Sequence, residues 1–242
     1  AYEMTSSLVG LGDVYKRQLY NREIRMIRSA FENQLHALNT NLILMGSLCE
    51  EIISKSLMLI SENDQHLVND VGKTYQKIEQ MERDIESQCL KLLLRQQPVA
   101  KDLRRISAAL KMVYDMKRIG AQSAEIVDII GDGHVHEGAE FRHLKQMVKH
   151  VVHMVTDSVD AFVHDDETLA LKVIQKDVTV DKEFDTIKAS LIAHIAELGN
   201  DGEYTIDVLM IAKYLERIGD HTVNVAKWVI FSITGELNGE ET

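Results

Sequence analysis

Residues 110–124 read LKMVYDMKRIGAQSA, and residues 209–223 repeat the pattern as LMIAKYLERIGDHTV. The clearest match aligns Arg118-Ile119-Gly120 with Arg217-Ile218-Gly219. The shift from position 120 to position 219 is 99 residues. Residues 55–65 match residues 157–167 in the same way, at a shift of 102. A unit of about 100 residues that occurs twice predicts a protein built from two similar halves.

The composition indicates the fold class. The chain has 242 residues, 45% of them hydrophobic, with 13 glycines and a single proline. Strand-rich folds need turn residues at short intervals, and such residues are scarce here. We therefore predict an all-α protein with long helices.

Apolar residues recur every three, four or seven positions in six segments, which is the spacing of an apolar helix stripe. The expected helices span about residues 27–61, 65–96, 98–130, 139–164, 165–198 and 204–233. Pro98 suits the first turn of the third helix, and Asp64 suits the cap of the second. Short turns make neighbouring helices antiparallel, so we expect two tandem three-helix bundles.

The predicted domain boundaries follow from this pattern. The first bundle occupies residues 26–131, the linker residues 132–138, the second bundle residues 139–235 and a tail residues 236–242. Residues 1–25 show weak helical periodicity and no trace of the repeat. We interpret them as a non-native or disordered leader.

The repeated phrase also predicts a seam on the third and sixth helices. The seam consists of Leu215, Ile218, Thr222, Val225 and Val229 in the second half and of Met116, Ile119, Ser123, Ile126 and Ile130 in the first. Gly120 and Gly219 lie beside the seam. Because glycine inside a helix costs about 1 kcal/mol, we expect both to permit close approach of another helix.

Charge and cysteine content limit the function classes. The net charge of −11 disfavours broad contact with nucleic acid or anionic lipid. No apolar stretch approaches the ~20 residues that span a bilayer, so we expect membrane contact only through partners. Cys49 and Cys89 lack CxxC spacing and are interpreted as buried, reduced thiols. We therefore expect a cytoplasmic protein.

Two acidic pairs at i, i+4 are the candidate metal ligands. Asp181 and Asp185 lie on the fifth expected helix, and Glu216 and Asp220 on the sixth. Carboxylates at this spacing repel each other, and pairs on adjacent helices could converge on a hard cation. The alternative interpretation is a solvated acidic face.

The first half lacks both pairs. Glu79 and Arg83 stand where the second half has Asp181 and Asp185, and Lys117 and Ala121 stand where it has Glu216 and Asp220. We therefore expect at most one complete metal site, in the second half. Lys117 and Arg83 would repel a cation or could together hold an anion instead.

Other candidates are weaker. Glu140 and His143 have the ExxH spacing of di-iron bundles, which need two such motifs, so surface residues are the simpler interpretation. His134, His136 and Glu137 fit a solvated linker better than a metal site.

His221 could be a further ligand, or a histidine that is exposed or hydrogen-bonded. Asp102 suits the helix dipole. No Gly-rich phosphate loop, nucleophile elbow or HExxH motif occurs, so we predict that the protein is not an enzyme.

Two longer phrases are similar to the signatures of a known family. Residues 98–105, PVAKDLRR, followed by Lys111 and Arg118-Ile119-Gly120, resemble the first-half signature of the PhoU family. Residues 214–221, YLERIGDH, followed by Asn224 and Ala226, resemble its second-half signature. The repeated three-helix layout extends the resemblance over residues 26–235.

This resemblance implies a function. Members of the family are cytoplasmic six-helix proteins, often dimeric, that repress the phosphate-starvation response when phosphate is plentiful. Their partners are the phosphate transporter ATPase, PstB, and the sensor histidine kinase, PhoR. Some bind iron, zinc or magnesium at E(D)xxxD pairs, a pattern that the four second-half acids match and the first-half residues Arg83, Lys117 and Ala121 do not. Asp102, Arg104 and Arg118 also match family positions.

The sequence thus predicts a non-enzymatic adaptor that represses phosphate uptake through a PstB-like ATPase and a PhoR-like kinase. We expect a homodimer. One alternative is a metal-binding helical-bundle protein, either a metal store or an oxidoreductase. The other is a PhoU-like regulator of a different transporter.

Overall fold

The computed structural model describes residues 2–62, 64–96, 98–195 and 202–236. The described residues form helices without any strand, which confirms the all-α prediction. The six helices are α1 Tyr2–Glu62, α2 Gln65–Gln96, α3 Ala100–Gly131, α4 Phe141–His164, α5 Glu167–Ile195 and α6 Gly202–Thr234.

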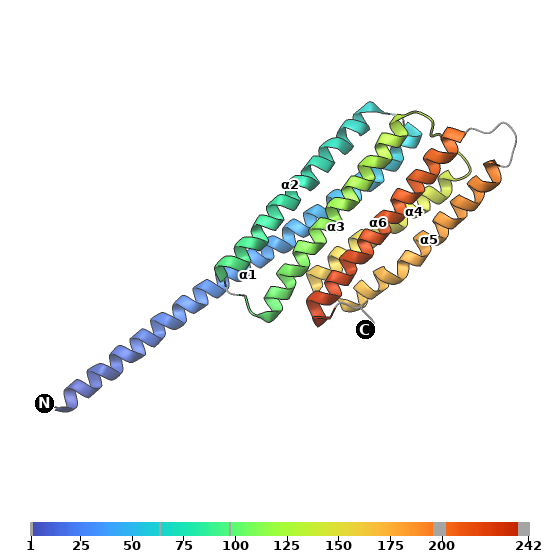
Figure 1. Ribbon diagram of the computed structural model, residues 1–242. Coiled ribbons are helices and arrows are strands. Elements are labelled where there is room, and N and C mark those ends of the chain that lie inside the picture. Colours follow the sequence, from blue (N-terminus) through green and yellow to red (C-terminus); the bar gives the residue numbers. More distant parts are fainter. Residues whose placement is uncertain (1, 63, 97, 196–201, 237–242) are drawn as a thin grey trace.

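The helices pack as two tandem three-helix bundles. Helices α1, α2 and α3 contact one another, as do α4, α5 and α6, and the halves join where α3 packs on α6 and α1 on α4. Among the described residues, α2 and α5 pack within their own halves and lie on the outer sides of the molecule (Figure 1). Helices α3 and α6 run in opposite directions, as do α1 and α4 (Figure 1). A two-fold rotation therefore relates the halves approximately.

Helix α1 begins far earlier than predicted. A start near residue 27 was expected, whereas the helix continues back to Tyr2 and its first part projects beyond the bundle (Figure 1). Phe31 is the first buried side chain described on α1. A helix can continue past the core without an apolar face, which is why periodicity missed this segment. The interpretation of residues 1–25 as a non-native or disordered leader stays a prediction.

The turns of the two halves use the same cap. Asp64 Oδ1 accepts a hydrogen bond of 2.8 Å from the backbone N–H of His66, and Asp166 Oδ1 accepts one of 2.9 Å from that of Leu169. Asp64 and Asp166 are 102 positions apart, so the repeat extends to its helix caps. The α3 prediction needs a small correction, because Val99 is the N-cap and Pro98 precedes it.

The predicted seam is buried. Its residues on α3 and α6 all lie in the interior, including the polar Ser123 and Thr222, whose hydroxyls donate to backbone carbonyls four residues earlier. Cys49 and Cys89 are buried, unbridged thiols, as predicted, and burial raises the pKa of Cys89 to about 12. Among the described residues, no helix has the combination of length and hydropathy that a membrane span requires.

Candidate functional site

Helices α5 and α6 approach closely at Gly219, in the middle of α6. A Cβ atom placed on Gly219 would stand 2.8 Å from Asp177 Oδ1 and 3.5 Å from Val180 Cγ1. The absence of a side chain on Gly219 therefore lets the Asp177 carboxylate lie directly against the α6 backbone.

The first half repeats this crossing with different chemistry. A Cβ atom placed on Gly120 of α3 would stand 3.1 Å from Ile78 Cδ1 and 3.3 Å from Tyr75 Cδ2, both on α2. Tyr75 and Ile78 stand 102 positions before their counterparts on α5. The close approach predicted for both glycines is confirmed, and a phenol in the first half replaces a carboxylate in the second.

Carboxylates gather around the crossing of α5 and α6. Burial, followed by the charges of Asp181, Asp220 and Glu216, raises the pKa of Asp177 to about 6. Burial and the charge of Glu216 likewise raise the pKa of Asp220, against the opposing charge of Lys213. These four acids, Asp177, Asp181, Glu216 and Asp220, are hereafter the acidic cluster. Bringing their charges together costs free energy, which a bound cation or a basic partner surface would offset.

The sequence predicted three of the four members of the acidic cluster. Asp185 stands one turn beyond Asp181, and its charge is not among those that act most strongly on Asp177 or Asp220. Asp177 was missed, although it stands four residues before Asp181. Asp181 forms an i, i+4 pair both with Asp177 and with Asp185. Only the packing of α5 against Gly219 shows that Asp177 is the one that belongs to the acidic cluster.

The acidic cluster has a partial internal counter-charge. Lys213 Nζ lies 2.6 Å from Glu216 Oε1 and 2.5 Å from Glu216 Oε2. Within the described parts of the chain, no three carboxylate, imidazole or thiolate side chains converge closely enough to hold a metal ion. The cluster therefore fits the charge of a cation but does not present an assembled coordination shell. Ligation by Asp181, Asp185, Glu216 and Asp220 stays a prediction.

In the first half, Lys117 stands where the second half has Glu216. Lys117 Nζ lies 2.5 Å from Glu82 Oε1, and the Glu82 carboxylate is buried. The hydrogen bond that Lys117 donates to the Glu82 carboxylate raises the pKa of Lys117. Arg83 instead donates to Gln80 Oε1 on the same helix. Because Lys117 and Arg83 have separate partners, the structure does not support the hypothesis that they hold an anion together.

Glu140 is not the surface residue that the sequence suggested. Its side chain is buried and accepts hydrogen bonds from Ser190 Oγ at 2.7 Å and from the Tyr204 hydroxyl at 2.9 Å. Burial alone would raise the pKa of Glu140, but these bonds lower it overall. His143 lies apart from this network, with Nδ1 2.6 Å from Glu183 Oε2. The ExxH spacing thus reflects two separate contacts that tie α4 to α5 and α6.

The linker histidines have separate contacts. His134 Nδ1 lies 3.1 Å from Asp207 Oδ2. The ring of His136 packs on that of Tyr204, with ring centroids 4.4 Å apart. Glu137 accepts a hydrogen bond from Ser61. These contacts fix the linker to the ends of both halves.

His221 on α6 contacts α3 of the other half. Its Nδ1 lies 2.9 Å from Asp115 Oδ1, and Asp115 is buried on α3. Of the alternatives that the sequence left open for His221, the structure shows the hydrogen-bonded histidine. Asp115 was missed as its partner, because a buried acid inside an apolar repeat is recognisable only once α3 and α6 are placed together.

Comparison with known proteins decides the family. The PhoU domain matches residues 42–130 and again residues 144–229, one copy in each three-helix bundle. The chain belongs to the PhoU family. It is 34% identical over 214 residues to the phosphate-specific transport system accessory protein PhoU homolog of Pseudomonas putida, covering 86% of this chain and 82% of that protein. The corresponding homolog of Pseudomonas aeruginosa is 33% identical over 214 residues.

Solved PhoU structures have the same fold. The crystal structure of PhoU from Pseudomonas aeruginosa superposes with a TM-score of 0.78 at 31% identity, covering 85% of this chain and all of that one. PhoU from Streptococcus pneumoniae, named a phosphate transport system regulatory protein, superposes with a TM-score of 0.79 at 25% identity over 87% of this chain. The tandem arrangement of three-helix bundles is therefore that of the PhoU family.

Proposed function

We propose that this chain is an accessory protein of a phosphate transport system and a negative regulator of phosphate uptake and phosphate-starvation signalling. The observation that carries the proposal is the match of both three-helix bundles to the PhoU domain. The relatives in two Pseudomonas species are named as accessory proteins of phosphate-specific transport, not as enzymes, which supports a non-catalytic role.

The proposed mechanism is occlusion by a cytoplasmic adaptor, expected to act as a homodimer. The adaptor docks on a PstB-like transporter ATPase and a PhoR-like sensor kinase and holds both in the inactive state. The acidic cluster supports a specific docking face. Its four carboxylates lie at one helix crossing in a chain of net charge −11, and such a face would attract a basic surface on a partner.

Two alternative functions compete with this proposal. A metal store or oxidoreductase would rest on the acidic cluster alone, whereas the accessory role rests on most of the chain. A PhoU-like regulator of another transporter would use the same fold, and the partner that binds would distinguish it.

The test is direct binding to the purified ATPase subunit and to the cytoplasmic part of the kinase. We expect both to bind. The double variant Asp181→Lys, Asp220→Lys should bind each of them with lower affinity, and its binding should depend less on the salt concentration. Glu125→Lys with Asp128→Lys, at exposed positions on α3, makes the same change in net charge and is the matched control, which should change neither. Absence of binding to both partners would refute the adaptor mechanism. Equal loss in the control would refute the assignment of the docking face.

A further inference from the structure

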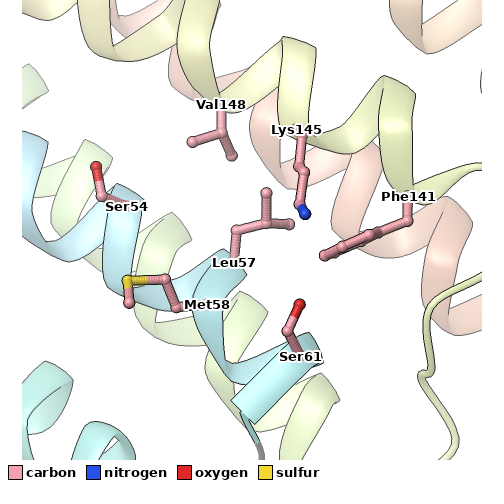
Figure 2. A pocket seen from close by; sticks show the side chains of 7 residues that line it. All are labelled: Ser54, Leu57, Met58, Ser61, Phe141, Lys145 and Val148. Atoms are coloured by element: carbon pink, nitrogen blue, oxygen red, sulfur yellow. The ribbon is translucent and has the colours of Figure 1, made fainter.

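A cavity of about 300 Å³ lies between α1 and α4, where the two halves meet (Figure 2). Its lining consists of Ser54, Leu57, Met58 and Ser61 from α1 and of Phe141, Lys145 and Val148 from α4. Figure 2 shows these side chains on the facing sides of the two helices. A molecule held there would touch both halves of the protein at once.

The internal repeat shows how the packing of α1 and α4 at the cavity differs from that at the equivalent place in the other half. Position 57 corresponds to position 159, and position 46 corresponds to position 148, both at the shift of 102. At the counterpart of the cavity, a Cβ atom placed on Gly46 would stand 3.0 Å from Val159 Cγ2, so the helices close on each other there. In the cavity, Val148 replaces that glycine and faces Leu57. The larger side chain keeps the backbones of α1 and α4 from approaching here as closely as they do at Gly46.

The cavity has an apolar floor and a polar rim. Leu57 and Phe141 are buried, while Met58 is 45% exposed at the edge. The Lys145 ammonium lies 4.2 Å from the centroid of the Phe141 ring. No ion pair with a carboxylate is found for Lys145 among the described residues, although acids outnumber bases by 38 to 27 in the sequence. An ammonium without a carboxylate partner beside an apolar floor is suited to an anion that carries an apolar body.

We propose that this cavity binds a small amphipathic carboxylate. The carboxylate would pair with Lys145 at the rim, and the apolar body would lie against Leu57 and Phe141. The volume supports a ligand of this size, since a cavity of about 150 Å³ suffices for benzene. Inorganic phosphate lacks the apolar body and would leave the floor unfilled.

The probe is hexanoate, titrated into the full chain by NMR or calorimetry, with hexanol as the uncharged comparison. We expect hexanoate to bind at millimolar concentration, in line with its few heavy atoms, and hexanol to bind about tenfold more weakly, since it lacks the charge-assisted bond. Lys145→Gln should weaken hexanoate by a similar factor. Lys149→Gln is the control, since Lys149 is an exposed lysine one turn along α4 that does not line the cavity.

A second variant keeps the test decisive. Ser54→Trp fills the cavity from an exposed position on α1, where the fold should tolerate it, and should abolish binding. Absence of hexanoate binding, or binding that Ser54→Trp leaves unchanged, would overturn the site. Equal affinity for hexanol and hexanoate, or equal effects of the two lysine variants, would overturn the role of Lys145 and hence the carboxylate class.

Discussion

Replacing Asp177 by asparagine should stabilise the protein at neutral pH. The pKa of this carboxyl rises from 3.8 to about 6 through burial and the charges of Asp181, Asp220 and Glu216. Each pKa unit corresponds to about 1.36 kcal/mol, so ionisation of Asp177 costs the folded state at most about 3 kcal/mol. Solvent screening reduces this cost to about 1–2 kcal/mol. The asparagine side chain would be neutral and close to isosteric beside Gly219, so the substitution should recover most of that amount.

The effect must depend on pH in a defined direction. In the folded protein Asp177 holds its proton up to about pH 6, whereas in the unfolded chain it loses the proton near pH 3.8. The folded state binds more protons between these values, so Asp177 lowers stability as pH rises through this window. The advantage of Asp177→Asn should therefore be near zero at pH 3.8, grow up to about pH 6 and remain constant above it.

Urea unfolding of both proteins at several pH values measures this difference directly. At pH 7 the variant should also melt about 2–6 °C higher, given the usual scaling for a chain of this size. The control is Asp185→Asn on the same helix, which should change stability by less than about 0.5 kcal/mol. A pH-independent difference, or equal gains in the two variants, would refute the electrostatic account of the acidic cluster.

Three further predictions concern the remaining polar contacts. Lys117→Met leaves the buried Glu82 carboxylate without its ammonium partner and should lower the free energy of unfolding, measured with urea, by about 1–3 kcal/mol. Adding Glu82→Leu should restore the stability. If it does not, the pairing of Lys117 with Glu82 is contradicted. Asp115→Ala removes the partner of His221 and should cost about 1–2 kcal/mol. Asp115→Asn retains an acceptor and should cost less, so equal losses would argue against the hydrogen bond. After dialysis against zinc and elemental analysis, Glu216→Ala with Asp220→Ala should contain less metal than the parent chain at unchanged helicity, and unchanged metal per chain would refute ligation by these residues.

Much of the fold was predictable because the repeat recurs at every level of the structure. The phrase around Gly120 and Gly219 predicted both the tandem bundles and the close helix crossings. Asp64 predicted the cap of α2. Periodicity failed at the start of α1, because residues before Phe31 continue the helix without an apolar stripe that would reveal it.

The candidate site was only partly predictable. Spacing along one helix brought Glu216 and Asp220 together, but it could not choose between Asp177 and Asp185 as neighbours of Asp181. That choice depends on how α5 packs against Gly219. Buried partners such as Asp115 for His221, and Tyr204 for Glu140, lie on different helices and are separated by many residues. No local pattern contains that information.

Expression of the full chain in a bacterial strain that lacks its own PhoU, with a phosphate-starvation reporter, tests the central claim most directly. The strain is grown in high phosphate, where the reporter stays active without a PhoU protein to repress it. If the chain is a negative regulator, the reporter will be switched off in high phosphate and will respond again to starvation. A reporter that stays active in high phosphate, in the presence of folded chain that binds the strain's ATPase and kinase, would contradict the account.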